Sequence, residues 1–322
     1  MTREQWLARR TFRGHDFDPE RLAARKRALG LSVSVCLPAL DVADTVGAIV
    51  EAVRSRWRDE VGLVDQVAVI DGRSSDDTAR VAAEAGAEVF REDEVLPEAG
   101  SRRGKGEALW KSLAAVSGDL VVWLDSDVRE FDPAFVPGLL GPLLTEPGVG
   151  YVKALYRRPL GDDAEGGGRV TEICARPLLN LFYPELAALV QPLSGEAAGR
   201  RALLERLPFM GGYAVEIGLL IDIVRRFGLA PLAQVDLGER RHRHQDTAAL
   251  GEMAYVITQA VLRRLAEDGR APFEPAEPGP YRRPVVSGDG YALRELELEL
   301  EERPPMATFA SYQARTGAAA LR

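Results

Sequence analysis

Three short apolar runs in the first half of the chain each end in a polar loop, and a helix-forming stretch follows each loop. The runs lie at residues 31–37, 64–70 and 121–124, and helices are predicted at about 44–56, 78–85, 107–115 and 133–144. Strands that alternate with helices predict an α/β fold with a doubly wound, mostly parallel sheet. Because ligands bind beyond the carboxyl ends of such strands, we expect the three loops to converge on one site.

The loop after the last of these runs begins with two aspartates, Asp125 and Asp127. Side chains alternate along an extended chain, so both carboxylates can face one divalent cation. Hard oxygen ligands suit Mg²⁺ or Mn²⁺, and these ions also take phosphate oxygens, as a nucleoside diphosphate sugar requires. After a strand, an Asp-x-Asp pattern forms a turn or a helix cap about as often as it binds a metal. The pattern therefore predicts a metal site only together with its surroundings.

Length and charge exclude several classes of protein. The chain has 322 residues, of which 46% are hydrophobic, so it can bury the core of one large or two modest domains. Its net charge of −8 gives no general attraction to nucleic acid or to an anionic membrane. The sequence shows no apolar export signal and no apolar run of about 18 residues, and Cys36 and Cys174 lie far apart in apolar surroundings. We therefore expect a soluble cytoplasmic protein without a disulfide, in which phosphate binding is local.

Two glycine-containing segments are suited to bind anions. Gly104-Lys105-Gly106 opens a predicted helix, where backbone N–H groups and an ammonium group can meet a phosphate. The spacing of a P-loop is absent, which argues against a mononucleotide kinase or ATPase. Further along, three glycines precede Arg169 and Thr171 at another predicted helix start, where backbone N–H groups and a guanidinium fork can hold an anion. The alternative for the first segment is that Lys105 is an exposed loop lysine, and the alternative for the second is a plain hinge loop.

Two further features carry ionisable side chains. Arg240-Arg-His-Arg-His244 is the only dense basic cluster in the sequence and holds two of its three histidines. It is either a solvated positive patch, or a site where imidazole joins the aspartates around a metal and arginines hold a phosphorylated acceptor. Glu216 precedes an apolar helix and is either a simple N-terminal helix carboxylate or a buried acid that faces a sugar.

Together, these segments resemble the retaining GT-A glycosyltransferases that make glucosyl-3-phosphoglycerate and mannosyl-3-phosphoglycerate. The similarity runs from about Ser32 to His244 and is densest at Pro38-Ala-Leu40, at Pro97 followed by Gly104-Lys-Gly-Glu-Ala-Leu-Trp110, and at Asp125-Ser-Asp127, Tyr156-Arg-Arg-Pro-Leu160, Gly166-Gly-Gly-Arg-Val-Thr-Glu172, Gln191-Pro-Leu-Ser-Gly-Glu196 and Gly212-Tyr-Ala-Val-Glu-Ile-Gly218. The resemblance implies a GT-A fold with a smaller acceptor-binding subdomain. It implies transfer of glucose or mannose from a nucleoside diphosphate to the 2-hydroxyl group of 3-phosphoglycerate, with retained configuration and with Mg²⁺ or Mn²⁺ as cofactor.

The resemblance also assigns roles to individual residues. The nucleotide-sugar would be bound by Pro38, Ala39, Leu40, Asp71, Lys105, Asp125 and Ser126. The acceptor would be bound by Gly168, Arg169 and Thr171, and the metal by Asp127 and His242. The basic cluster itself suggests Arg243 and His244 as further acceptor contacts. Catalysis would rest on Glu216, Asp127 and Lys105. Because no carboxylate nucleophile is obvious in the sequence, we expect front-face attack on the sugar, with Glu216 orienting it.

The sequence departs from the glucosyl members of the family at three places. Asp41-Val42 stands where they usually read Asn-Glu, so the carboxylate expected near the ribose is missing. Gly72 replaces a serine of the nucleobase pocket, and His244 competes with His242 as the metal ligand. These changes leave open the base, uridine or guanosine, and the sugar, glucose or mannose.

Two rival functions explain parts of the same pattern. A sugar nucleotidyltransferase is built on a similar sheet, but it needs a glycine-rich loop directly after the first strand, and Pro38-Ala-Leu-Asp41 is not one. A non-catalytic nucleotide-sugar-binding protein is suggested only by the changes at Val42 and Gly72.

For the organisation of the chain, we expect a helical arm at residues 1–30 and a nucleotide-sugar-binding domain at 31–150. An acceptor-binding subdomain at 151–270 and an extended tail at 271–322 would follow. The expected assembly is a homodimer that binds the two small substrates and neither nucleic acid nor a membrane.

Overall fold

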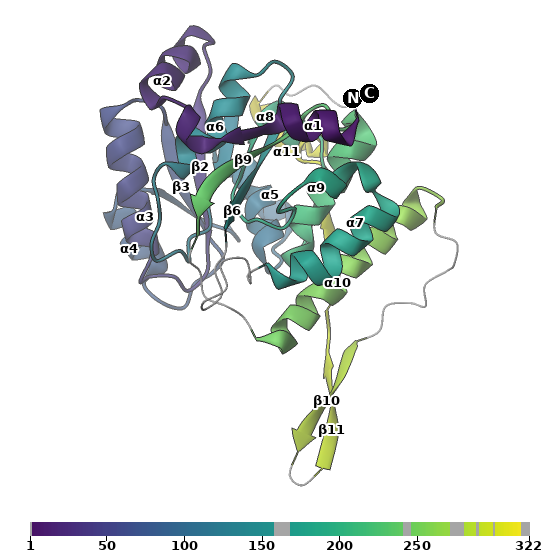
Figure 1. Cartoon of the computed structure of the whole chain (residues 1–322). Helices are drawn as coiled ribbons and strands as arrows, with labels where there is room; N and C mark the ends of the chain where they lie inside the picture. The colour runs from purple at the N-terminus through teal and green to yellow at the C-terminus, as the bar shows by residue number, and fades with distance from the viewer. Residues whose placement is uncertain are drawn as a thin grey trace.

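A single eight-stranded sheet runs through the molecule and carries helices on both faces (Figure 1). This computed structural model describes residues 2–157, 168–240, 246–270, 280–287, 290–298 and 300–316. The strand order is β1-β9-β6-β7-β5-β2-β3-β4. The strands are β1 (Thr11–Arg13), β2 (Val33–Ala39), β3 (Gln66–Asp71), β4 (Glu88–Arg91), β5 (Leu120–Trp123), β6 (Tyr151–Arg157), β7 (Ala197–Arg200) and β9 (Leu232–Glu239). All neighbours pair in parallel except β7, which is antiparallel to both β5 and β6.

The two faces of the sheet belong to two separate hydrophobic cores. On β5, Val121 and Trp123 point into one core, whereas Leu120 and Val122 point into the other, as the alternation of side chains along a strand requires. The first core is closed by α5 (Lys105–Ala115), α7 (Arg176–Phe182), α9 (Val215–Phe227) and α10 (Thr247–Glu267). The second is closed by α2 (Pro19–Ala28), α3 (Val46–Val53) and α6 (Phe135–Thr145). The remaining helices are α1 (Arg3–Arg10), α4 (Thr78–Glu84), α8 (Arg201–Leu204) and α11 (Ala310–Thr316).

The doubly wound, mostly parallel sheet is confirmed, but the sheet contains three strands that we did not predict: β1, β7 and β9. Strand β1 lies inside the N-terminal segment that we expected to be a helical arm, and it forms the edge of the sheet beside β9. Strand β7 is short and made mainly of small residues, so no apolar run marks it in the sequence. The sheet also crosses residue 150, where we placed a domain boundary, because β7 pairs with β5 and β9 pairs with β1, and β6 lies between β7 and β9.

The C-terminal segment is only partly the extended tail that we expected. Strands β10 (Tyr281–Ser287) and β11 (Gly290–Leu296) form a hairpin that stands away from the body of the molecule (Figure 1). After it, β12 (Glu302–Arg303) pairs with β8 (Phe209–Met210), and α11 packs on the core. Two forces hold this part of the chain in place. Met306 and Tyr312 are fully buried, and the Arg303 guanidinium binds the Glu107 carboxylate of α5 at 2.6 Å.

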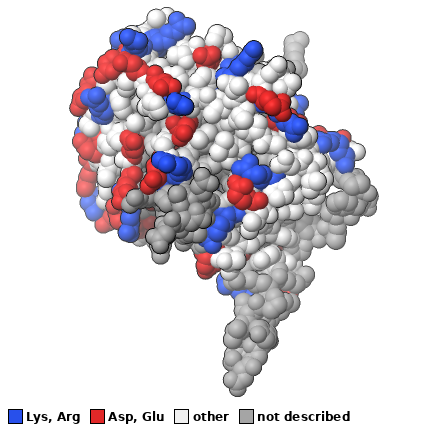
Figure 2. Space-filling view, viewed as in Figure 1, with Lys and Arg blue, Asp and Glu red and all other residues white. Residues whose placement is uncertain are grey.

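The surface carries both signs of charge. On the face shown in Figure 2, acidic and basic side chains are interspersed rather than gathered into one large patch of a single sign. None of the helices in the described ranges combines the length and the apolar character that crossing a lipid bilayer requires. Both cysteines, Cys36 and Cys174, are free thiols, as predicted.

Candidate functional site

The carboxyl ends of β2, β3 and β5 open onto a cavity of about 760 Å³. Most of the residues that the sequence assigned to the site line this cavity: Pro38, Ala39, Leu40, Lys105, Asp125, Ser126, Asp127, Gly168, Arg169, Thr171 and Glu216. Asp71 is buried instead, and its carboxylate accepts the backbone N–H of Ser74 at 3.3 Å. His242, Arg243 and His244 lie outside the described residues. The three polar loops therefore converge on one site, as expected at the carboxyl ends of parallel strands.

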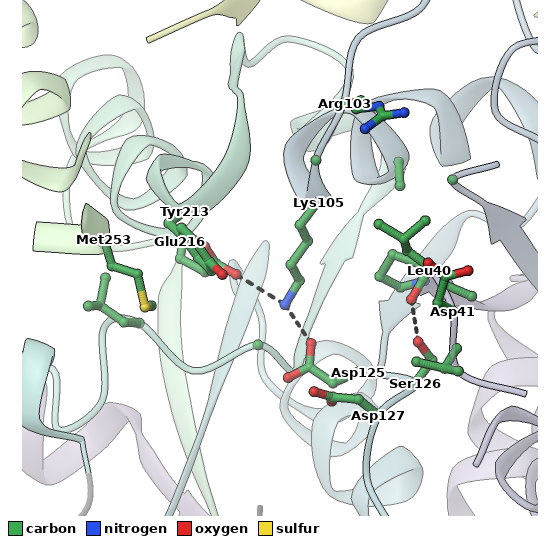
Figure 3. Close-up of a pocket in the computed structure, with 18 of the residues that line it drawn as sticks. Leu40, Asp41, Arg103, Lys105, Asp125, Ser126, Asp127, Tyr213, Glu216 and Met253 are labelled. Atoms are coloured by element: carbon green, nitrogen blue, oxygen red, sulfur yellow. Dashed lines mark hydrogen bonds and ion pairs between the residues drawn. The ribbon is translucent and has the colours of Figure 1, made fainter. Parts of the chain in front are cut away.

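Lys105 lies at the centre of this arrangement (Figure 3). It is the first residue of α5 and follows Gly104, whose φ of 113° favours glycine. Its ammonium group contacts Asp125 Oδ1 at 2.5 Å and Glu216 Oε1 at 3.1 Å. Burial lowers the pKa of Lys105, but the carboxylates of Asp125 and Glu216 outweigh it and raise the pKa overall. Lys105 is thus a permanent cation at a helix N-terminus, which is a suitable place to bind an anion.

The carboxylate of Asp125 is held by protein cations on both oxygens. While Lys105 contacts Oδ1, Arg240 donates to Oδ2 at 2.9 Å. Arg240 is itself buried and reaches Glu196 at 3.2 Å and the Tyr156 hydroxyl at 2.9 Å. Burial raises the pKa of Asp125, but the two cations outweigh it and lower the pKa overall. Asp125 is therefore a fixed anion that organises Lys105 and Arg240 around it.

Asp127 is placed differently from Asp125. Its side chain is 70% exposed, and the guanidinium of Arg240 lies 3.7 Å away. Mg²⁺ and Mn²⁺ bind readily to one or two protein carboxylates and complete their coordination with water and substrate phosphates. Within the described ranges, no three His, Cys, Asp or Glu side chains gather into a metal cage. An exposed carboxylate in a cavity wall therefore fits an ion that is shared with a phosphorylated ligand.

The loops on the other side of the cavity are held in uncommon backbone conformations. Asp41 has a φ of 53° and Arg73 a φ of 68°, although neither is glycine, and both line the cavity. Such strain concentrates at ligand sites, where the surrounding structure enforces it. The Asp41 carboxylate accepts the backbone N–H of Ser75 at 2.7 Å, and Ser126 donates to the carbonyl of Pro38 at 2.5 Å. These bonds join the loops after β2, β3 and β5 into one surface.

The far wall of the cavity is formed by Gly168 to Thr171 and by α10. Leu250, Met253 and Ile257 of α10 give this wall an apolar strip, and Tyr213 lies beside Glu216 (Figure 3). Gly168 has a φ of 72°, which lets the chain turn into the helical segment that carries Arg169 and Thr171.

Sequence reasoning missed several residues of the site. Arg73, Glu92 and Arg103 line the cavity, but each lies in a loop where charged residues are common. Gly195 was part of a quoted motif, yet its function was not recognised. A methyl group at Gly195 would lie 2.0 Å from Asp125 Oδ2, so only glycine lets the backbone pass this carboxylate.

We predict that Gly195→Ala lowers kcat by about a hundredfold, because the added methyl group must displace the Asp125 carboxylate or the loop by about 1 Å. Gly150→Ala is the matched control, since its added methyl group meets the movable side chain of Leu203 at 2.7 Å. The measurement is steady-state turnover together with the melting temperature of each variant. An alanine at position 195 that leaves kcat within twofold of the wild type would contradict the tight contact.

Comparison with known proteins gives consistent matches. The family model described as glycosyl transferase family 2 matches residues 34–207. Glucosyl-3-phosphoglycerate synthase of Petrotoga mobilis is 43% identical over 95% of this chain and 96% of its own, and that of Mycobacterium tuberculosis is 46% identical over 86% of each. The crystal structure of mannosyl-3-phosphoglycerate synthase from Rubrobacter xylanophilus is 46% identical, with a TM-score of 0.87 over 95% of this chain and 97% of that one. Glucosyl-3-phosphoglycerate synthase from M. tuberculosis, in complex with Mn²⁺, UDP and phosphoglyceric acid, is 43% identical, with a TM-score of 0.79 over 90% and 94%.

Proposed function

The chain belongs to glycosyl transferase family 2, and from this premise we propose that it transfers glucose or mannose from a nucleoside diphosphate to the 2-hydroxyl group of 3-phosphoglycerate. The observation that carries the proposal is the position of Lys105 between Asp125 and Glu216, next to the exposed carboxylate of Asp127. Relatives crystallised with Mn²⁺ or Mg²⁺ together with UDP support a metal-dependent glycosyltransferase. A glucosyl and a mannosyl relative are each 46% identical to this chain, so either sugar fits the proposal.

The donor diphosphate is proposed to lie against the N-terminus of α5. There, Lys105 and the backbone N–H groups of the first turn would receive the charge that develops as the glycosidic bond breaks. A divalent ion bound by Asp127, with His242 as the second protein ligand, would supply further positive charge to the same diphosphate. Since Asp125 is already paired with two cations, its proposed role is to orient the Lys105 and Arg240 side chains rather than to bind the metal ion directly.

The sugar is proposed to lie beside Glu216, the second residue of α9. This carboxylate is buried and shares the Lys105 ammonium group with Asp125. A carboxylate held in this way is suited to accept a hydrogen bond from a sugar hydroxyl group. We therefore propose that Glu216 orients the sugar and that the acceptor attacks from the side of the leaving group, a positioning effect.

The acceptor is proposed to bind where Gly168, Arg169 and Thr171 line the cavity. We predict that Arg169→Ala raises the KM for 3-phosphoglycerate about 10- to 100-fold and the donor KM far less, because a guanidinium bond to an anion is worth about 1.5 to 3 kcal/mol. Arg176→Ala is the control, since Arg176 follows on the next helix and pairs with Glu172 at 2.7 Å. A larger rise in the donor KM would assign this loop to the diphosphate.

A matrix of donors and acceptors tests the function as a whole. Purified protein is incubated with UDP- and GDP-linked glucose and mannose, with and without 3-phosphoglycerate, in Mg²⁺ or Mn²⁺. Release of nucleoside diphosphate that depends on 3-phosphoglycerate supports the proposal. Donor binding without turnover would indicate a nucleotide-sugar-binding protein. Formation of a nucleotide sugar in a parallel incubation with UTP or GTP and a sugar 1-phosphate would indicate a nucleotidyltransferase.

We also propose a homodimer in the cytoplasm. A two-stranded hairpin is marginally stable by itself, so the β10–β11 hairpin, which stands away from the body, favours contact with a second copy. Two free cysteines suit a reducing compartment. Light scattering on the full chain, compared with a variant in which residues 281–296 are replaced by a short glycine-serine linker, tests the assembly.

A further inference from the structure

A second lysine lies directly behind the wall of the cavity. Lys153 is in the middle of β6, between Ala197 of β7 and Gln234 of β9, and is only 2% exposed. Its neighbours Val152 and Ala154 point into the core on the far face of the sheet. Lys153 therefore points toward the face that is covered by α5 and α9. A buried ammonium group is costly unless it is bonded, so a partner is required.

That partner is a backbone carbonyl of the loop before β7. The ammonium group of Lys153 donates to the carbonyl oxygen of Ser194. Ser194 is followed by Gly195, where an added Cβ would lie 2.0 Å from Asp125 Oδ2, and both Leu193 and Gly195 line the cavity. Lys153 thus fixes the stretch of backbone that separates it from the reacting groups.

The loop has other anchors, but they act on different atoms. The hydroxyl group of Ser194 donates to the carbonyl of Ala154 at 2.6 Å, and the backbone N–H of Ala154 donates to the carbonyl of Glu196 at 3.1 Å. These bonds hold the loop on β6 even without the lysine. Among the bonds of the described residues, the one from Lys153 sets the direction of the peptide group that leads into Gly195.

We propose that Lys153 is a positioning residue for sugar transfer: its ammonium group fixes the Ser194 carbonyl and thereby holds the Leu193–Gly195 backbone against Asp125 in the cavity wall. The inference rests on the proposed function of the same site. Without this bond, the peptide at Ser194 rotates, Asp125 loses its close neighbour, and Lys105 no longer has one fixed position.

The charge of Lys153 makes this arrangement sensitive to pH. Its pKa is lowered to about 8, chiefly by burial. Of the charged groups that face it, Glu216 on α9 raises the pKa, Lys105 on α5 lowers it, and Glu196 and Asp125 raise it. Lys153 is therefore protonated below about pH 8 and neutral above it. A neutral amine still donates a hydrogen bond, but without charge assistance the bond is about half as strong.

The test compares Lys153→Met and Lys153→Arg with the wild type. We expect Lys153→Met to lower kcat about 10- to 100-fold at pH 7, with both KM values within about threefold, because misplacement of reacting groups affects turnover more than binding. Lys26→Met is the matched control, since Lys26 is equally buried and pairs with Asp65 at 2.7 Å near the opposite ends of the strands. It should lose stability and keep its kcat.

The pH profile separates positioning from a merely structural role. In the wild type, kcat/KM should fall as the pH rises through about 8. In Lys153→Arg this fall should vanish, because a guanidinium group stays charged throughout the range. If Lys153→Met does not fold, the pH profiles of the wild type and of Lys153→Arg still test whether Lys153 is a positioning residue. The same alkaline fall in both proteins, or a Lys153→Met enzyme with wild-type kcat, would overturn the inference alone. A wild type without any transfer would count against the proposed function itself.

Discussion

Asp127→Asn is expected to lower kcat by about a thousandfold or more at saturating Mg²⁺ or Mn²⁺, because a bound ion contributes several kcal/mol toward stabilising the charge of a departing diphosphate. The substitution keeps the shape of the side chain and removes its charge. Since the side chain is 70% exposed, the fold should be retained. The metal site itself is measured without turnover, as the rise in melting temperature that Mn²⁺ and a nucleoside diphosphate together give the wild type. This rise should be lost in the variant.

A closely matched control exists for this experiment. Asp44 is also 70% exposed and also lies 3.7 Å from an arginine, Arg129, but it does not line the cavity. Asp44→Asn should therefore keep both turnover and the metal-dependent rise in melting temperature. Near-normal turnover of Asp127→Asn in saturating metal would show that the ion, if required, is held by other groups.

Lys105→Met is the second change with a large expected effect, a fall in kcat of about 10²- to 10³-fold, which is typical of losing one preorganised group that stabilises developing charge. The variant leaves the carboxylates of Asp125 and Glu216 facing each other without the cation between them. Donor binding should weaken as well, because the same ammonium group is proposed to meet the diphosphate. Turnover and calorimetric binding of UDP and GDP measure the two effects separately.

The control for this variant is a lysine of the same helix. Lys111 is fully buried and donates to the carbonyls of Glu92 and Gly100, so Lys111→Met removes a buried cation without touching Asp125. The Lys111→Met variant should therefore show a lower stability of the fold. If Lys105→Met keeps kcat within tenfold of the wild type, the diphosphate does not lie against the start of α5.

The sequence predicted those parts of the fold whose signal is local. Apolar runs of several residues mark β2, β3 and β5, and the position of ligand sites at the carboxyl ends of parallel strands follows from the topology. The three residues of β1 and the small residues of β7 give no such signal. These strands form because a neighbouring strand offers unpaired backbone groups, which is information that no short window contains.

The same distinction explains which site residues were found. Asp125 and Lys105 stood out because each is flanked by a recognisable motif. The bond between Asp125 and Arg240 joins positions 115 residues apart, and no spacing rule connects them. Lys153 reads as an ordinary residue of an apolar strand, and only the folded structure shows that its side chain reaches the Ser194 carbonyl. The assignment of His242 and His244 remains a prediction.

The pairing of β1 with β9 has a consequence for how the protein is made. Thr11 and Gln234 are partners in the sheet and are also joined by their side chains, although 223 residues separate them. At a synthesis rate of about 5–20 residues per second, the start of the chain leaves the ribosome roughly 10 to 45 s before its partner strand. During that interval β1 lacks the strand with which it pairs. The indole N–H of Trp6 likewise lacks its native acceptor, the carbonyl of Leu232. The nascent chain thus carries a largely charged N-terminal segment in which the side chain that the fold buries, Trp6, cannot form its native hydrogen bond until β9, the strand leading into Arg240, has emerged.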